Sequence, residues 1–217
     1  MSNTPRLAEA LQTVENSRAA GWPERLGPYD FLVNMETQAP RLTHIGFIPG
    51  VLLDIPSVEA QQRIAQIPQD VAQTRLRLLK ARQTISQERM AAGELEQGLL
   101  LRLDVLSELR GMEPERAKAQ LQKLVNATTA GWDIRLLRTK AVEAALPHTY
   151  GMVLFGEPTA PEAVYIQRAE DQDPHEFFND TPATPEWAGK IYEVLSGMAF
   201  DSEFSGDHLQ QTLKSYE

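Results

Sequence analysis

The chain contains no cysteine, which excludes disulfides, thiolate metal sites and cysteine nucleophiles. This composition is compatible with a reducing compartment, and we expect a cytoplasmic protein. The sequence also has no run of the roughly 18–20 uncharged apolar residues that a transmembrane helix requires. Its first residues show neither the basic nor the apolar part of a secretory signal peptide. We therefore expect a protein without a transmembrane segment.

Common catalytic and cofactor motifs are also missing. The segment Gly46–Gly50 is too short for a phosphate-binding loop and is not followed by Gly-Lys-Ser/Thr. No His-Glu-x-x-His and no Gly-x-Ser-x-Gly pattern occurs. The histidines stand apart from any nucleophile in the sequence, and they are His44, His148, His175 and His208. We assign no catalytic residue and no cofactor, and the sequence favours a protein that is not an enzyme.

The charge of the chain is distributed unevenly. Hydrophobic residues make up 42% and charged residues 24% of the 217 positions, which is ordinary for a globular protein. Residues 1–149 carry a net charge of +1, whereas residues 150–217 hold three basic and thirteen acidic residues. Such an asymmetry concerns partners and solubility more than fold. We expect a mildly basic helical body followed by an acidic end.

An apolar pattern with the period of a coiled coil begins at Ile64. One heptad register is apolar throughout, while Thr74, Glu88 and Arg102 interrupt the companion register. We call the strongest positions the seam, and they are Ile64, Val71, Leu78, Ile85, Leu95, Leu99 and Leu106. The seam packs either internally, against helices predicted at residues 114–129 and 132–146, or externally, against another chain. The sequence leaves both arrangements open.

The length of the helix that carries the seam is a separate question. Pro68 is expected to kink or restart the helix, because proline removes a helical hydrogen bond. Residues 69–110 then form either one helix of about 60 Å or a hairpin that turns at Ala91-Ala92-Gly93. We prefer the single helix, because the heptad register continues through Gly93.

Shorter apolar runs predict strands. Those at Tyr29–Val33, Thr43–Ile48 and Val51–Ile55 predict two or three, and residues 150–166 predict a β-hairpin around a loop rich in glycine and proline. We expect these segments, residues 29–55 and 150–168, to form one small antiparallel sheet. The fold class is then α+β and mainly helical, with long amphipathic helices arranged as a coiled-coil-like hairpin or bundle. The helices of residues 57–146 would be an insertion between two halves of the sheet.

The C-terminal part is predicted to be a separate unit. Residues 1–168 form the helical body, and residues 169–217 comprise an acidic loop followed by two amphipathic helices. Thr184-Pro185 is typical of a helix start. The apolar side of the helix that follows contains Trp187, Ile191, Val194 or Leu195, and Met198. A final helix is predicted at residues 206–216.

Two clusters of charged residues are candidates for ligand binding. The basic face of the long helix consists of Arg75, Arg77, Lys80 and Arg82. It could contact phosphates, but no aromatic residue lies between positions 63 and 131 and the protein is acidic overall, so nucleic acid is not a favoured partner. The second cluster could contribute to a divalent-metal site, and it consists of Asp171, Asp173, His175 and Glu176. It lacks the glycine and glutamate that a calcium loop requires, and a solvated acidic loop is the simpler interpretation.

Three hypotheses about function follow. The leading one is a non-enzymatic assembly or adaptor protein that binds another protein, or a second copy of itself, through the seam and the C-terminal helices. The second is a metal-dependent hydrolase or nuclease that uses the cluster at residues 171–176. The third is a nucleic-acid-associated protein whose acidic C-terminal region screens its own basic helix.

Overall fold

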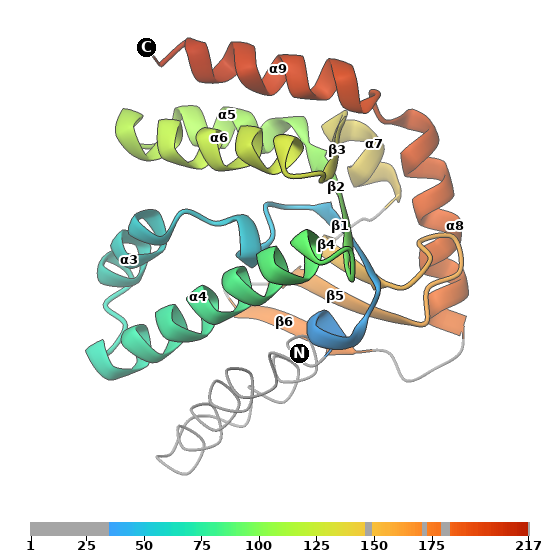
Figure 1. The fold of residues 1–217 in the computed structure, drawn as a ribbon, viewed down its shortest axis with the longest axis horizontal. Helices are drawn as coiled ribbons and strands as arrows, with labels where there is room; N and C mark the ends of the chain where they lie inside the picture. Colours follow the sequence, from blue (N-terminus) through green and yellow to red (C-terminus); the bar gives the residue numbers. More distant parts are fainter. Residues whose placement is uncertain (1–34, 146–148, 171–172, 179–182, 217) are drawn as a thin grey trace.

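The computed structural model describes residues 35–145, 149–170, 173–178 and 183–216 (Figure 1). Residues 35–38 are helical. The elements that follow are, in chain order, β1 (Arg41–Gly46), η2 (Gly50–Leu52), α3 (Ile55–Ile64), α4 (Gln69–Ala91), β2 (Glu96–Arg102), α5 (Leu103–Arg110), α6 (Pro114–Thr129), β3 (Asp133–Leu137), α7 (Thr139–Ala145), β4 (Thr149–Phe155), β5 (Ala163–Glu170), β6 (Asp173–Phe178), α8 (Ala183–Met198) and α9 (Ser202–Lys214).

These strands form one mixed sheet in the order β3-β2-β1-β4-β5-β6. The pairs β3–β2 and β2–β1 are parallel, and the remaining neighbours, from β1 to β6, are antiparallel. The expected fold class, a small antiparallel sheet beside a coiled-coil-like hairpin or bundle, is therefore wrong. Residues 57–146 supply the interior strand β2 and the edge strand β3 of this sheet, so they are not a helical insertion.

Residues 69–110 form neither the single long helix nor the helical hairpin that the sequence predicts, so both predictions are wrong. Helix α4 ends at Ala91, and Gly93 adopts a positive φ of 70°. This left-handed conformation suits glycine and turns the chain directly into β2. Leucines 99, 100 and 101 are all buried, because helices cover both faces of the sheet at this strand. A continuous apolar run is typical of a strand buried on two sides.

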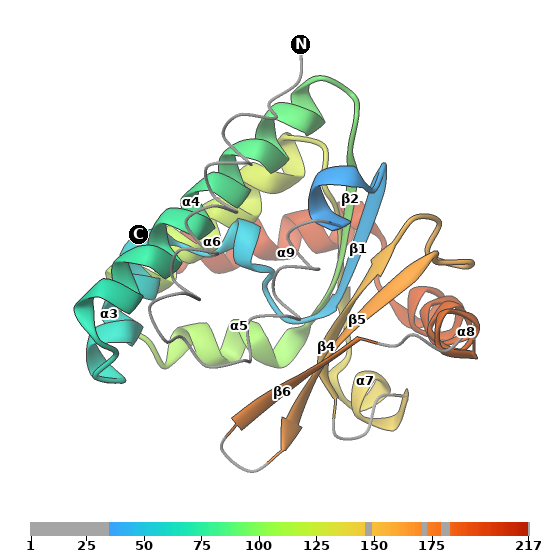
Figure 2. The same cartoon turned by 90° about the horizontal axis from the view of Figure 1, so that it is seen from below.

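Helices pack on both faces of the sheet (Figure 2). The larger core joins leucines of β2 and β3 to the apolar stripes of α6 and α9, with Leu121, Leu124 and Leu209 fully buried. The opposite face packs against α7 and α8 through a second core, which includes Leu137, Val142 and Leu195. A third cluster surrounds Leu42 and Phe155 where β1 pairs with β4. The result is a sheet between two helical layers.

Other local predictions had mixed outcomes. The β-hairpin of residues 150–166 is present as β4 and β5, and α6 begins at Pro114 as expected. The predicted strand at Val51–Ile55 is instead the 3-10 turn η2 and the start of α3, which the Asp54 side chain caps by accepting from the Ser57 amide at 3.0 Å. The predicted helix at residues 132–146 divides into β3 and α7. The predicted N-terminal helix and the strand at Tyr29–Val33 lie outside the described residues.

The predicted loop at residues 169–184 is wrong within the described residues, because β5 extends to Glu170 and β6 covers Asp173–Phe178. The division of the chain at residue 168 stays a prediction, and that position falls inside β5. In the part of the chain that the structure describes, no helix combines the length and apolar character needed to span a bilayer.

Candidate interaction face

The seam residues do not share one surface. Leu78 and Ile85 are buried on α4, Leu95 is buried just before β2, Leu99 in the middle of β2, and Leu106 on α5. Ile64 points the other way, with 77% of its surface exposed at the end of α3. Val71 is half-buried. Most of the seam residues are therefore buried within the chain, where they belong to different elements and different core clusters.

The residues of the predicted basic face do not form one exposed surface either. Arg77 and Lys80 are exposed on α4, and Arg75 takes part in an interaction of its own. Arg82 is buried and donates through Nε and Nη2 to the two carboxylate oxygens of Glu36, at 2.6 and 2.5 Å. Arg89, two turns further along α4, donates to the carbonyl oxygens of Glu36 and Ala39. These arginines fasten the segment before β1 onto α4, so they are not a free phosphate-binding surface.

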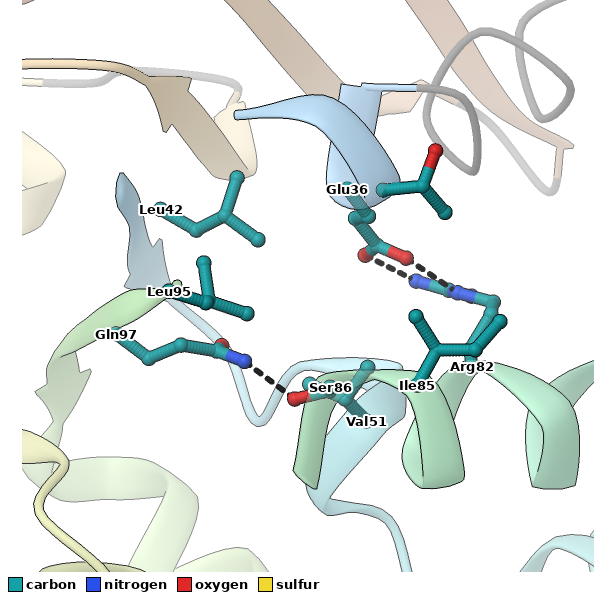
Figure 3. Close-up of a pocket in the computed structure, with 9 residues that line it drawn as sticks. Glu36, Leu42, Val51, Arg82, Ile85, Ser86, Leu95 and Gln97 are labelled. Atoms are coloured by element: carbon teal, nitrogen blue, oxygen red, sulfur yellow. Dashed lines mark hydrogen bonds and ion pairs between the residues drawn. The ribbon is translucent and has the colours of Figure 1, made fainter. Parts of the chain in front are cut away.

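The same ion pair lines a small cavity (Figure 3). Its volume is about 10 Å³, which is room for one water molecule. Gln97 of β2 donates a short hydrogen bond to the Ser86 hydroxyl at its other side, while the Gln97 Oε1 atom has no hydrogen-bond partner among the described residues. A space of this size fits a bridging water and not a substrate.

His44 lies in the middle of β1. The side chain is buried, its ring stacks on Trp132 at 5.8 Å, and neither ring nitrogen completes a hydrogen bond within the described part of the chain. Burial lowers the pKa of His44 to about 3, the nearby Gln97 side chain opposes this shift, and the positive charge of Arg82 adds to it. The imidazole is therefore neutral at physiological pH and inaccessible to a substrate.

Open α/β sheets usually bind ligands at the carboxyl ends of their parallel strands. Here Arg102 donates two hydrogen bonds to the Asp104 carboxylate, at 3.0 and 2.6 Å, and the Asp104 amide donates to the Thr139 hydroxyl at 3.2 Å. Partial burial raises the pKa of Asp104, but its hydrogen bonds and the charge of Arg102 outweigh this and lower the pKa overall. The cluster links β2, α5 and α7, and its polar groups are occupied by one another.

The candidate metal cluster is described only in part. Asp171 lies outside the described residues, and Asp173, His175 and Glu176 are backbone positions on β6, paired with Glu170, Arg168 and Gln167 of β5. Among the residues that the structure describes, no group of three or more histidine, aspartate or glutamate side chains is placed to hold a metal ion.

Helix α8 is held rigidly by its inner face. Ala188 and Leu195 are fully buried in the core that α8 shares with the sheet. A β-carbon at Gly189 would lie 2.4 Å from the Thr159 carbonyl oxygen, so only glycine permits this close approach of α8 to the β4–β5 loop. Arg135 of β3 donates to the carbonyl oxygens of Ser196 and Phe200 at the end of the helix. The fold therefore fixes the orientation of α8 from both ends.

The outer face of α8 is apolar and faces solvent. We define it as Trp187, Val194 and Met198, with the half-buried Ile191 at its margin. The exposed fractions of the first three side chains are 41%, 55% and 54%. They account for three of the five large apolar side chains exposed in the described part of the chain; the others are Ile64 and Phe204, and Phe204 stacks on Phe200 and His208. Figures 1 and 2 both place α8 at the rim of the molecule.

Charged residues border this face. Lys190 donates to the Glu186 carboxylate at 2.6 Å, one helical turn away, and both side chains are exposed. The hydrogen bond and charge of Lys190 lower the pKa of Glu186, and those of Glu186 raise the pKa of Lys190. Glu193 is exposed on the same border. An exposed apolar stripe with charged residues along one side is a composition found in protein-binding patches.

The sequence showed the spacing of this face but not its direction. Trp187, Ile191, Val194 and Met198 form one apolar stripe, yet Ala188 and Leu195 form a second one, and the structure buries the second. Comparisons with protein-family models, with curated proteins and with solved structures found no match. The geometry of this chain is therefore the only guide to its function.

Proposed function

We propose that the protein is a non-enzymatic interaction module that binds another polypeptide chain through the outer face of α8. The observation that carries this proposal is the alignment of Trp187, Val194 and Met198 on one exposed stripe of a helix whose neighbouring stripe, Ala188 and Leu195, is fully buried. Burying these side chains against a partner would remove apolar surface from water, which is the main favourable term in protein association. Tryptophan is also enriched among the residues that dominate binding energy at interfaces.

The rigidity of α8 supports the same proposal. A preformed binding helix loses little conformational entropy when a partner docks, so more of the contact energy appears as affinity. The glycine contact at Thr159 and the arginine bonds from β3 hold the helix before any partner arrives. The leading hypothesis from the sequence is thereby kept in one part, the C-terminal helices, while the seam no longer contributes to it.

The test is site-specific photo-crosslinking with the full chain in its native cells. A photoreactive benzoylphenylalanine replaces Val194 in one variant and Gln87, which is exposed on α4, in a matched control. We expect irradiation to give a discrete adduct with a polypeptide from position 194 and none from position 87. The absence of an adduct at position 194, or adducts of equal yield at both positions, would overturn the proposal.

A further inference from the structure

The edge strand β3 bonds the backbone groups of its open side to other parts of the same chain. In a parallel pair, the bonds between strands use every second residue, so the residues in between direct N–H and C=O away from the neighbouring strand. At Leu136 the amide donates to the Ser205 hydroxyl at 2.9 Å, and the carbonyl oxygen accepts from the Phe200 amide at 3.0 Å. Two residues earlier, the Ile134 amide donates to the Trp132 carbonyl oxygen at 3.2 Å. These groups are therefore already occupied.

The chain between α8 and α9 supplies the groups that a further strand would supply. We call residues 199–205 the corner; they join the two helices and include the first turn of α9, which begins beside β3 (Figure 1). A neighbouring strand would place a C=O opposite the Leu136 amide and an N–H opposite its carbonyl oxygen. The Ser205 hydroxyl oxygen and the Phe200 N–H hold these two positions. Ser205 is fully buried, and its hydroxyl also donates to the Asp201 carbonyl oxygen at 2.6 Å, so both of its bonding functions are used.

Side chains of β3 fasten the corner in place. Arg135 donates through Nη2 to the Ser196 carbonyl oxygen at 2.7 Å and through Nε to the Phe200 carbonyl oxygen at 3.2 Å. The Ser202 hydroxyl donates to the Asp133 carboxylate at the start of the strand. The corner is thus bonded to both the backbone and the side chains of β3, and it covers this edge of the sheet in the folded chain.

We propose that the corner prevents β3 from pairing with an extended segment of another polypeptide. Open edge strands bind further strands through their backbone groups, which leads to peptide capture or to aggregation. Strand β3 is prone to this because three of its five residues are apolar: Ile134, Leu136 and Leu137. This role is separate from the proposed function, because it uses the side of the two helices that faces the sheet and not the outer face of α8.

Amide hydrogen exchange, followed by NMR on the full chain, tests whether the edge is closed. We expect slow exchange at the Leu136 amide of the wild type, as for amides within the sheet. Ser205→Ala removes the acceptor and should speed exchange at Leu136 about ten-fold more than at Leu100 of the interior strand β2. Rapid exchange at Leu136 in the wild type would overturn the proposal. Equal acceleration at both amides would also overturn it, because Ser205 would then affect only overall stability.

Capture of a labelled peptide tests what the corner excludes. The probe is a fluorescein-labelled peptide of residues 131–138, which carries the β3 sequence, and fluorescence anisotropy measures its binding. The double variant Arg135→Ala/Ser205→Ala loosens the corner and should bind the probe about ten-fold more tightly than the wild type does. Gln120→Ala is the matched control, because it removes two buried hydrogen bonds made by α6 and leaves the corner intact. It should bind the probe like the wild type.

The outcomes distinguish a closed edge from a general loss of stability. Equal binding by the double variant and the wild type would overturn the proposal. Binding by Gln120→Ala as tight as that by the double variant would do the same, because capture would then follow from destabilisation alone. Circular dichroism checks that each variant is folded. If the double variant is unfolded, Ser205→Ala alone decides, since it keeps the Arg135 bonds and should bind the probe more tightly than Gln120→Ala does.

Discussion

Arg82 and Glu36 form a buried, bidentate ion pair that joins positions 46 residues apart in the sequence. Both side chains are less than a tenth exposed, and the aliphatic residues Leu42, Ile85 and Leu95 line the cavity around them. The pair links the helical residues 35–38, which precede β1, to α4. An ion pair in such surroundings loses hydration on folding, and its net contribution depends on both partners being present.

Breaking this pair from one side should be costly. Glu36→Gln removes the negative charge that contacts the buried Arg82 guanidinium at two points, and we expect a loss of about 3–5 kcal/mol in the free energy of unfolding. The double variant Glu36→Leu/Arg82→Met replaces both charges by apolar groups and should recover to within about 2 kcal/mol of the wild type. Urea unfolding measures both, with Lys80→Met as an exposed control on α4. Additive losses in the double variant would contradict the coupling.

His44 should make the protein sensitive to acid. Its pKa is about 3 in the folded chain and near 6.5 when unfolded, so between these values the unfolded chain binds the additional proton. Acidification from pH 6.5 toward pH 3 therefore favours unfolding, with a contribution from His44 of up to about 1.4 kcal/mol for each pH unit.

The variant His44→Leu isolates this contribution. At pH 7 it should be at least as stable as the wild type, because the imidazole nitrogens lose no hydrogen bond when they are removed. The stability difference between variant and wild type should then grow as the pH falls from 6.5 to 4. Chemical unfolding at several pH values measures it, and a difference independent of pH would contradict the buried neutral imidazole.

The elements with strong local signals could be predicted from the sequence. Proline at the first position and glycine beyond the end delimited α6, and a turn-rich loop between apolar runs identified the β4–β5 hairpin. Strand β2 could not be recognised in this way. Leu99 and Leu106 happen to continue the heptad register of α4 across the turn at Gly93, so the phase of the pattern was preserved without a helix.

The remaining errors have a common physical cause. Strand β3 has only five residues and is stabilised by pairing with β2, which is close in space but about 35 residues earlier in the sequence. Pairing and burial of this kind determine strand formation more than local propensity does. The exposed face of α8 could not be predicted for the same reason, because both stripes of the helix are apolar and only the position of the sheet decides which one is buried.

Gln120 of α6 should be unusually important for the segment that follows β1. Its side-chain amide donates to the Leu52 carbonyl oxygen and its carbonyl accepts from the Asp54 amide, both at 2.9 Å in buried surroundings. Gln120→Ala leaves two buried backbone groups unpaired, and we expect a loss of about 2–4 kcal/mol in unfolding free energy. Within the described residues, the exposed neighbour Gln122 donates to Asn126 alone, so Gln122→Ala should change stability by less than about 0.5 kcal/mol. Thermal and urea unfolding measure both variants. If Gln120→Ala and Gln122→Ala lowered the unfolding free energy equally, this role of Gln120 would be contradicted.

Two glycines of α8 should respond in opposite directions to the same substitution. Gly189→Ala forces a β-carbon against the Thr159 carbonyl oxygen, a backbone atom that moves only if the helix or the β4–β5 loop moves. We expect a loss of about 1–3 kcal/mol, as for other overpacked positions. At Gly197 an added β-carbon meets nothing within 4 Å, and alanine should stabilise the helix by about 0.5–1 kcal/mol.

The two variants also separate the position of α8 from its surface composition. Gly189→Ala leaves Trp187, Val194 and Met198 in the sequence but displaces the helix that presents them, so it should lower the yield of the photo-crosslinked adduct from position 194 as well as lower stability. Gly197→Ala leaves the position of the helix unchanged and should retain the adduct. Equal adduct yields from both variants, despite the lower stability of Gly189→Ala, would show that the outer face acts independently of how closely α8 packs on the sheet.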